Sequence, residues 1–184
     1  MRIIPILQRF RRAKDGLAAV EFAFILPVLI TMFFGTVEMS NALGARADVT
    51  AIASTAADLV AQQSNVTNAD MTNVMSALNS ILYPYPTSTA TIVISSVVVD
   101  NSGNGKVAWS DAQNGTARTV GSTIPTTILP AGLLTAGSGQ GIIMAEITYN
   151  YSSTSTQVMK LPISMSNVFF AKPRKSLTVT RSAS

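Results

Sequence analysis

The sequence predicts an α+β protein: a long N-terminal transmembrane helix that continues as an amphipathic helix, then a second helix and a small antiparallel β-sheet domain. Three observations predict this fold. An apolar run extends from Leu17 to Val37, helical periodicity continues to Leu82, and β-branched segments separated by turns follow from Ala90. The expected parts are a basic cytoplasmic leader (1–16), a transmembrane helix (17–39), a helical segment (40–86) and a β-rich outer domain (87–184).

The net positive charge is concentrated before the apolar run. The chain carries 13 Lys and Arg against 9 Asp and Glu, a formal net charge of +4. Residues 1–16 hold five basic side chains and one acidic one, so residues 17–184 are balanced. A basic cluster beside an apolar run indicates a cytoplasmic flank. We therefore expect residues 40–184 outside the cytoplasm and no nucleic-acid binding, because no basic stripe remains.

The apolar run is long enough to span a membrane. Leu17 to Val37 is 21 residues, and about 20 residues cross a hydrocarbon core about 30 Å thick as a helix. Pro27 lies inside the run. It lacks the N–H that would bond to the carbonyl of Ala23, so a bend is expected there. Membrane helices tolerate such a proline better than soluble helices do.

One carboxylate, Glu21, interrupts the apolar run. An acidic side chain at the centre of a membrane helix costs roughly 2.5–3.5 kcal/mol on insertion scales, so such residues usually have a partner or a function. One interpretation keeps Glu21 near the headgroups, where the positive N-terminus of the helix favours it. The other pairs it with a new α-amino group on Leu17, which cleavage after Gly16 would create.

Three kinds of segment fit this pattern. An ordinary secretory signal has an apolar region of about 7–15 residues before a small-residue cleavage site. Ala42-Leu43-Gly44 offers such a site, but the apolar run is longer and contains Glu21. An uncleaved anchor would keep residues 1–16 and tether an outer domain that binds or adheres to a partner. A prepilin-type segment would be cut on its cytoplasmic side.

The residues around Gly16 resemble the processing site of prepilins from the tight-adherence pilus system. In that family a peptidase cuts after a glycine, and a glutamate lies five residues further on. An aromatic residue follows the glutamate, usually tyrosine in the major pilin, and here it is Phe22. The longer pattern more closely resembles TadE-like minor pilins (pseudopilins). Its matching positions are Gly16, Ala18, Ala19, Val20, Glu21, Phe22, Ala23, Leu26 and Pro27.

The resemblance implies a minor pilin that is located in the bacterial inner membrane. It would contribute to assembly of an adhesive, type IV-like pilus. It implies processing after Gly16 by a prepilin peptidase that recognises Gly16, Leu17, Glu21 and Phe22. It also implies assembly in the membrane through Leu17, Glu21 and Pro27. The implied partners are the inner-membrane assembly platform, the major pilin and sister minor pilins. The C-terminal domain would lie in the periplasm or at the cell surface.

Two helical segments are expected before residue 87. Few helix breakers lie between Ser40 and Gln63, so the membrane helix is expected to continue. Residues 64–68 read as a turn, and Thr67 with Asp70 resembles a capping arrangement for the second helix. That helix places its apolar residues on one face: Met71, Val74, Met75, Leu78, Ile81 and Leu82. The methionines are interpreted as core residues.

The remaining chain reads as strands and turns. The expected strands are 91–99, 106–110, 142–151 and 177–181, with 161–170 ambiguous between strand and helix and 116–141 a long loop. Trp109-Ser110-Asp111 and Ala145 to Tyr151 resemble strand signatures of TadE-like proteins, and Lys172-Pro173-Arg174 resembles their basic C-terminal segment.

No catalytic or cofactor site is expected. The chain has no His and no Cys, which removes the commonest general base and the commonest soft metal ligands. Asp100 and Asp111 flank a predicted hairpin, but no Asp-x-Asp spacing supports a calcium site. A membrane-tethered enzyme would require Asp100, Asp111 or Glu146 to converge in one cleft. No metal or other cofactor is therefore expected.

Overall fold

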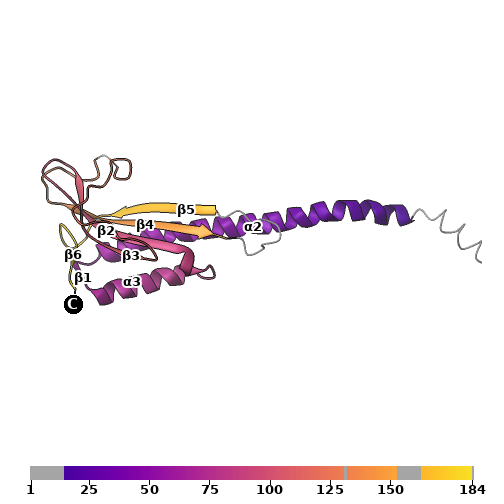
Figure 1. The fold of residues 1–184 in the computed structure, drawn as a ribbon, viewed down its shortest axis with the longest axis horizontal. Helices are drawn as coiled ribbons and strands as arrows, with labels where there is room; N and C mark the ends of the chain where they lie inside the picture. The colour runs from indigo at the N-terminus through magenta and orange to yellow at the C-terminus, as the bar shows by residue number, and fades with distance from the viewer. Residues whose placement is uncertain (1–14, 131, 153–162, 184) are drawn as a thin grey trace, which may run out of the picture. The chain divides into compact units, whose positions relative to one another are not determined.

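The computed structural model describes residues 15–130, 132–152 and 163–183 (Figure 1). The chain divides into two compact units. Of the described residues, the first unit contains 15–41 and the second contains 42–130, 132–152 and 163–183. The first unit contains the N-terminal part of the long helix α2. The second contains the rest of α2 and all the other described elements.

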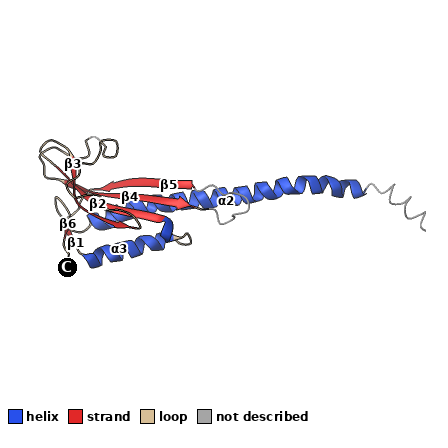
Figure 2. Cartoon of the chain, in the orientation of Figure 1, coloured by secondary structure: helices blue, strands red, loops and turns tan. Residues whose placement is uncertain are grey.

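Helix α2 extends over Asp15–Ala61 without interruption, 47 residues that include Pro27 (Figure 2). The predicted continuation of the apolar helix beyond residue 39 is therefore confirmed. Within the second unit, every third or fourth residue of α2 is buried, from Ala42 to Ala61. Most of these residues are alanines, whose small side chains let the helix backbone lie close to the sheet. The helix ends where the backbone N–H of Arg174 bonds to the carbonyl of Ala61, at 2.9 Å.

A short connection leads to helix α3, Asn68–Ile81. Strand β1, Asn65–Val66, occupies part of the predicted turn. The predicted cap is confirmed as a capping box: the Thr67 hydroxyl accepts from the backbone N–H of Asp70, and the Asp70 carboxylate accepts from the N–H of Thr67. The hydrogen bonds that the Thr67 N–H and the Thr67 hydroxyl donate to the Asp70 carboxylate lower its pKa below the usual value. A short 3-10 helix, Thr87–Thr89, precedes the sheet.

Four antiparallel strands form the main sheet, in the order β3-β2-β4-β5. Their bounds are Ala90–Val99 for β2, Gly105–Gln113 for β3, Gly141–Tyr151 for β4 and Ile163–Ala171 for β5. The register pairs Ser95 with both Ser110 and Met144, so β2 lies inside the sheet between β3 and β4. Strand β5 pairs only with β4 and lies at one edge. The fold class predicted from the sequence is confirmed.

One face of the sheet packs against the two helices. The contributing side chains come from α2, from α3 and from alternate positions of the strands, as the two-residue period of a strand requires. Figure 1 shows both helices on this side. The largest fully buried members include Ile52, Leu78, Ile92, Ile147, Tyr149 and Tyr151. Met71 is buried in this core, as predicted.

A second, smaller core lies on the other face of the sheet. Its buried members are Val97, Val107, Ile124, Ile142 and Met144, and apolar residues of the 128–134 segment pack against them. The long loop predicted between residues 116 and 141 is therefore present. It also buries apolar surface, because Ile124, Ile128, Leu129, Leu133 and Leu134 face the sheet.

The C-terminal segment, 179–181, forms hydrogen bonds both to the sheet and to residues near the start of α3. Strand β6 is only Thr180–Arg181 and pairs in parallel with β1, so the expected strand over 177–181 is wrong for its first three residues. The indole N–H of Trp109 donates to the carbonyl of Val179 at 2.7 Å. Arg181 donates to Asp111 at 2.7 Å and to the side-chain oxygen of Asn68 at 2.6 Å. These contacts leave the segment little room to pair with the main sheet.

Candidate functional site: the exposed apolar part of helix α2

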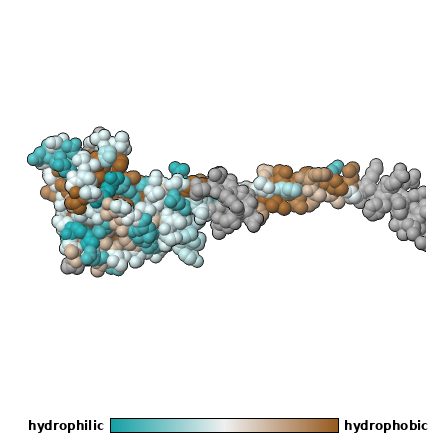
Figure 3. All heavy atoms as spheres, in the orientation of Figure 1, coloured by the Kyte–Doolittle hydropathy of each residue, from teal (hydrophilic) through white to brown (hydrophobic). Residues whose placement is uncertain are grey.

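The N-terminal part of α2 presents large apolar side chains on all sides. Leu17 is 63% exposed, Phe22 57% and Phe24 78%. Figure 3 shows this part of the helix as mainly hydrophobic, in contrast to the mixed surface of the other unit. A helix that is apolar all round needs an apolar environment, which is either a protein core or a membrane. Among the described residues, this is the one helix long and apolar enough to cross a membrane.

Gly16 has no structural requirement to be glycine. It lies in the first turn of α2, and a Cβ added to it would meet no atom within 4 Å. It is also not among the glycines with positive φ. Glycine in a helix costs about 1 kcal/mol relative to alanine. The fold therefore gives no reason for glycine here.

Glu21 is exposed on the same helix, four residues after Leu17. Residues four apart lie on one helix face, one turn from each other. A carboxylate at Glu21 is therefore within one turn of the backbone nitrogen of Leu17. The next acidic residue of the helix, Glu38, is instead buried, at 6% exposure. The two acids have different surroundings, and only Glu21 is displayed on the exposed apolar surface.

Pro27 creates a second polar group in this part of the helix. Because proline has no N–H, the carbonyl of Ala23 lacks its usual helical donor. One turn further on, the carbonyl of Pro27 accepts a hydrogen bond from the hydroxyl of Thr31 at 2.8 Å. Thr36 bonds to Met32 in the same way at 2.8 Å. These hydroxyl bonds were not predicted above, although the position of Thr31 four residues after Pro27 is the spacing at which a threonine hydroxyl reaches back to a helix carbonyl.

The acids considered for catalysis or calcium binding do not converge. Asp100 accepts from the backbone N–H groups of Ser102 and Asn104, both at 2.9 Å, and so holds the β2–β3 turn. Asp111 pairs with Arg181 at 2.7 Å. Glu146 accepts two hydrogen bonds from Arg118, at 2.5 and 2.6 Å. Among the described residues no cluster of three acids, histidines or cysteines is present.

Three of the four tyrosines of the chain pack in the folded core. Tyr149 and Tyr151 are buried, and the ring of Tyr85 lies 6.5 and 6.0 Å from theirs. Burial raises the pKa of Tyr149 above its usual value. Tyr83 alone of the four is largely exposed. Three of the four therefore contribute to packing near the end of α3.

The described residues thus define a protein with one exposed apolar helix, suited to a single-pass membrane anchor, that continues into an α+β domain. The family described as TadE-like protein matches residues 16–58. Over this segment the chain resembles that family, which confirms the predicted resemblance. The match begins at Gly16 and ends in the last turn of α2. Neither the curated proteins nor the solved structures gave a match.

Proposed function

We propose that the protein is a minor pilin or pseudopilin that contributes to assembly of a tight-adherence pilus. The observation that carries this proposal is the TadE-like match over a segment that begins at Gly16 and includes Glu21 and Pro27 on an exposed apolar helix. A prepilin peptidase cuts after Gly16 and leaves Leu17 as the new N-terminus. The helix stays in the inner membrane as a single pass until the subunit is assembled.

Cleavage produces a positive charge at the N-terminus of the helix, where the helix dipole disfavours it. The α-ammonium of Leu17 would lie at the positive end of the helix dipole, which favours anions. A carboxylate offsets this cost, and Glu21 is the acid within one turn. An ammonium has three N–H donors. The ammonium of a neighbouring subunit can therefore donate to the Glu21 carboxylate.

In this mechanism the apolar helix provides the contact surface between subunits, and Glu21 fixes the axial position of one helix relative to the next. Apolar side chains gain little from helix association in lipid, because the lipid tails are equally apolar. A buried charge pair forms only when the two helices meet at one height. Assembly with the major pilin and the sister minor pilins therefore depends on Glu21, and the inner-membrane platform acts on subunits already aligned in this way.

Deletion of the gene in the native host tests the function. We expect surface filaments to fall to near zero, because a minor pilin is needed to begin or sustain assembly, and expression of the intact chain should restore them. Filaments are counted by electron microscopy, and cell attachment to a surface is measured in parallel. Normal filament numbers with reduced attachment would contradict the proposal and favour an uncleaved, membrane-anchored adhesion protein.

A further inference from the structure

The two edges of the main sheet are treated differently. The edge at β3 is covered by the chain itself: the N–H of Val107 donates to Ser122, and the N–H of Ile124 donates to Gly105, at 3.0 and 2.8 Å. Lys106 and Thr123 form a further bridge on this side. Among the described residues, no backbone group of β5 bonds to any segment other than β4. Within the part of the chain that the structure describes, the edge at β5 is therefore open over Ile163–Ala171.

Strand β5 lacks the features that usually protect an open edge. Its nine residues include no charged side chain and no proline, whereas natural edge strands are commonly short, charged or interrupted. Three of its apolar side chains are partly exposed: Ile163 at 42%, Val168 at 38% and Phe169 at 41%. A long, neutral, apolar edge is a template for addition of another strand.

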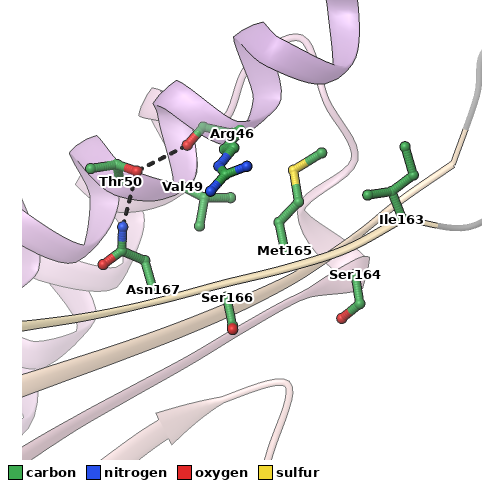
Figure 4. Close-up of a pocket in the computed structure, with 8 residues that line it drawn as sticks. All are labelled: Arg46, Val49, Thr50, Ile163, Ser164, Met165, Ser166 and Asn167. Carbon is green, nitrogen blue, oxygen red and sulfur yellow. Dashed lines mark hydrogen bonds between the residues drawn. The ribbon is translucent and has the colours of Figure 1, made fainter. Parts of the chain in front are cut away.

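Two hollows lie beside this edge, between β5 and helix α2. The first, about 370 Å³, is lined by Arg46, Val49 and Thr50 of the helix and by residues 163–167 of the strand (Figure 4). The second, about 340 Å³, is lined by Phe169 of the strand and by Ser54, Thr55, Asp58 and Leu59 of the helix. The side chain of Asn167 separates them by donating to the Thr50 hydroxyl at 3.0 Å. Alternate side chains of an added strand point to one face and would enter these hollows.

The charges beside β5 identify the kind of strand that fits. Arg46 is exposed at the Ile163 end and forms no ion pair among the described residues. Lys172 is exposed directly after the other end. Antiparallel pairing of two β5 strands would bring Lys172 of one copy near Arg46 of the other, and parallel pairing would bring the two Lys172 side chains together. Like charges opposite each other disfavour a second copy, and the covered β3 edge removes the other pairing.

We propose that β5 and the adjacent face of α2 bind an extended segment of another protein, which adds to the sheet as a fifth strand. The segment is neutral and apolar at alternate positions, and it carries acidic residues at its ends. Its backbone bonds to the open N–H and C=O groups of β5. Its inward side chains fill the two hollows, and its terminal carboxylates pair with Arg46 and Lys172.

A synthetic peptide tests this binding mode on the full chain in detergent micelles. The probe is a fluorescent peptide of alternating valine and threonine between two terminal glutamates, measured by anisotropy against empty micelles. We expect it to bind roughly five- to tenfold more tightly than the same peptide with terminal lysines, as expected for exposed ion pairs reinforced by removal of repulsion. Hydrogen exchange should slow at residues 163–171 when the peptide is added, with β3 unchanged.

Two controls make the result specific. A peptide with methyl groups on alternate backbone nitrogens should not bind, because it lacks the donors of an added strand. The variant Arg46→Glu should lose the preference for glutamate, whereas Lys106→Glu makes the same charge change at the β3 edge and should keep it; circular dichroism verifies that both fold. No binding, equal binding of the methylated peptide, or unchanged exchange in β5 overturns the proposal. So does an Arg46→Glu variant with unaltered peptide preference but weaker binding to phosphatidylglycerol vesicles, which would assign Arg46 to a lipid surface.

Discussion

Replacing Glu21 by glutamine is expected to abolish incorporation of the subunit into filaments while leaving membrane insertion intact. The amide has nearly the shape of the carboxylate but no charge, so the neighbouring α-ammonium would be buried without its partner. Breaking a buried ion pair in this way costs about 3–5 kcal/mol, which is more than about a hundredfold in an association equilibrium. The measurement is an immunoblot of the variant in sheared filaments and in the membrane fraction.

A conservative change separates charge from shape at this position. Glu21→Asp keeps the charge but shortens the side chain by one methylene, so we expect partial incorporation, between the original chain and Glu21→Gln. Protease protection of the membrane segment should be the same in all three proteins. Equal incorporation of Glu21→Gln and the original chain would refute the pairing mechanism and favour a carboxylate near the headgroups.

Replacing Gly16 by leucine is expected to slow processing strongly. The fold does not need glycine there, since a Cβ at Gly16 would meet no atom within 4 Å, and leucine is the better helix former. A loss of processing would therefore reflect poorer recognition by the peptidase, because the fold of this chain is unaffected. Glycine allows a closer approach of the backbone to a cleft than any other residue does. A misfit side chain in such a cleft lowers the rate roughly tenfold or more, and mass spectrometry of the purified protein measures the processed fraction.

Gly35 provides the matched control in the same helix. A Cβ at Gly35 also meets no atom within 4 Å, and Gly35 is far from the proposed cleavage site. Gly35→Leu makes the same chemical change and should be processed like the original chain. Complete processing of Gly16→Leu, or an equal defect in both variants, would contradict recognition of Gly16 by a peptidase.

The helices could be predicted because their signals are local. Apolar residues at helical spacing predicted the continuation of α2, and Thr67 with Asp70 predicted the start of α3, which the structure confirms as a capping box. The β2–β3 hairpin was predicted from its turn, and the structure explains it through the backbone bonds of Asp100. Each of these features depends on residues only a few positions apart.

The remaining fold depends on contacts between distant residues. Strand β5 was ambiguous in the sequence, and pairing with β4 decides it. The segment 177–181 has the composition of a strand, but Trp109 and Arg181 hold it beside β1, where only two of its residues pair. Neither outcome follows from local propensity, because cross-strand packing commonly overrides it.

The candidate site was predictable for a different reason. Gly16, Glu21 and Pro27 each violate the pattern of an apolar helix, and such violations are visible in the sequence itself. The structure adds that Gly16 is not required by packing and that Thr31 bonds to the Pro27 carbonyl. The open edge at β5 was not predictable, because it depends on which of the described residues bond to β3 and on the lack of such bonds to β5 among them.

The most direct test of the central claim is the intact mass and N-terminal sequence of the protein purified from its native host. Processing after Gly16 predicts a mature chain that begins at Leu17. A chain that begins at Met1 would contradict the proposal and indicate an uncleaved anchor. A chain that begins near Ala45 would also contradict it, since ordinary signal cleavage would have removed the helix that carries Glu21.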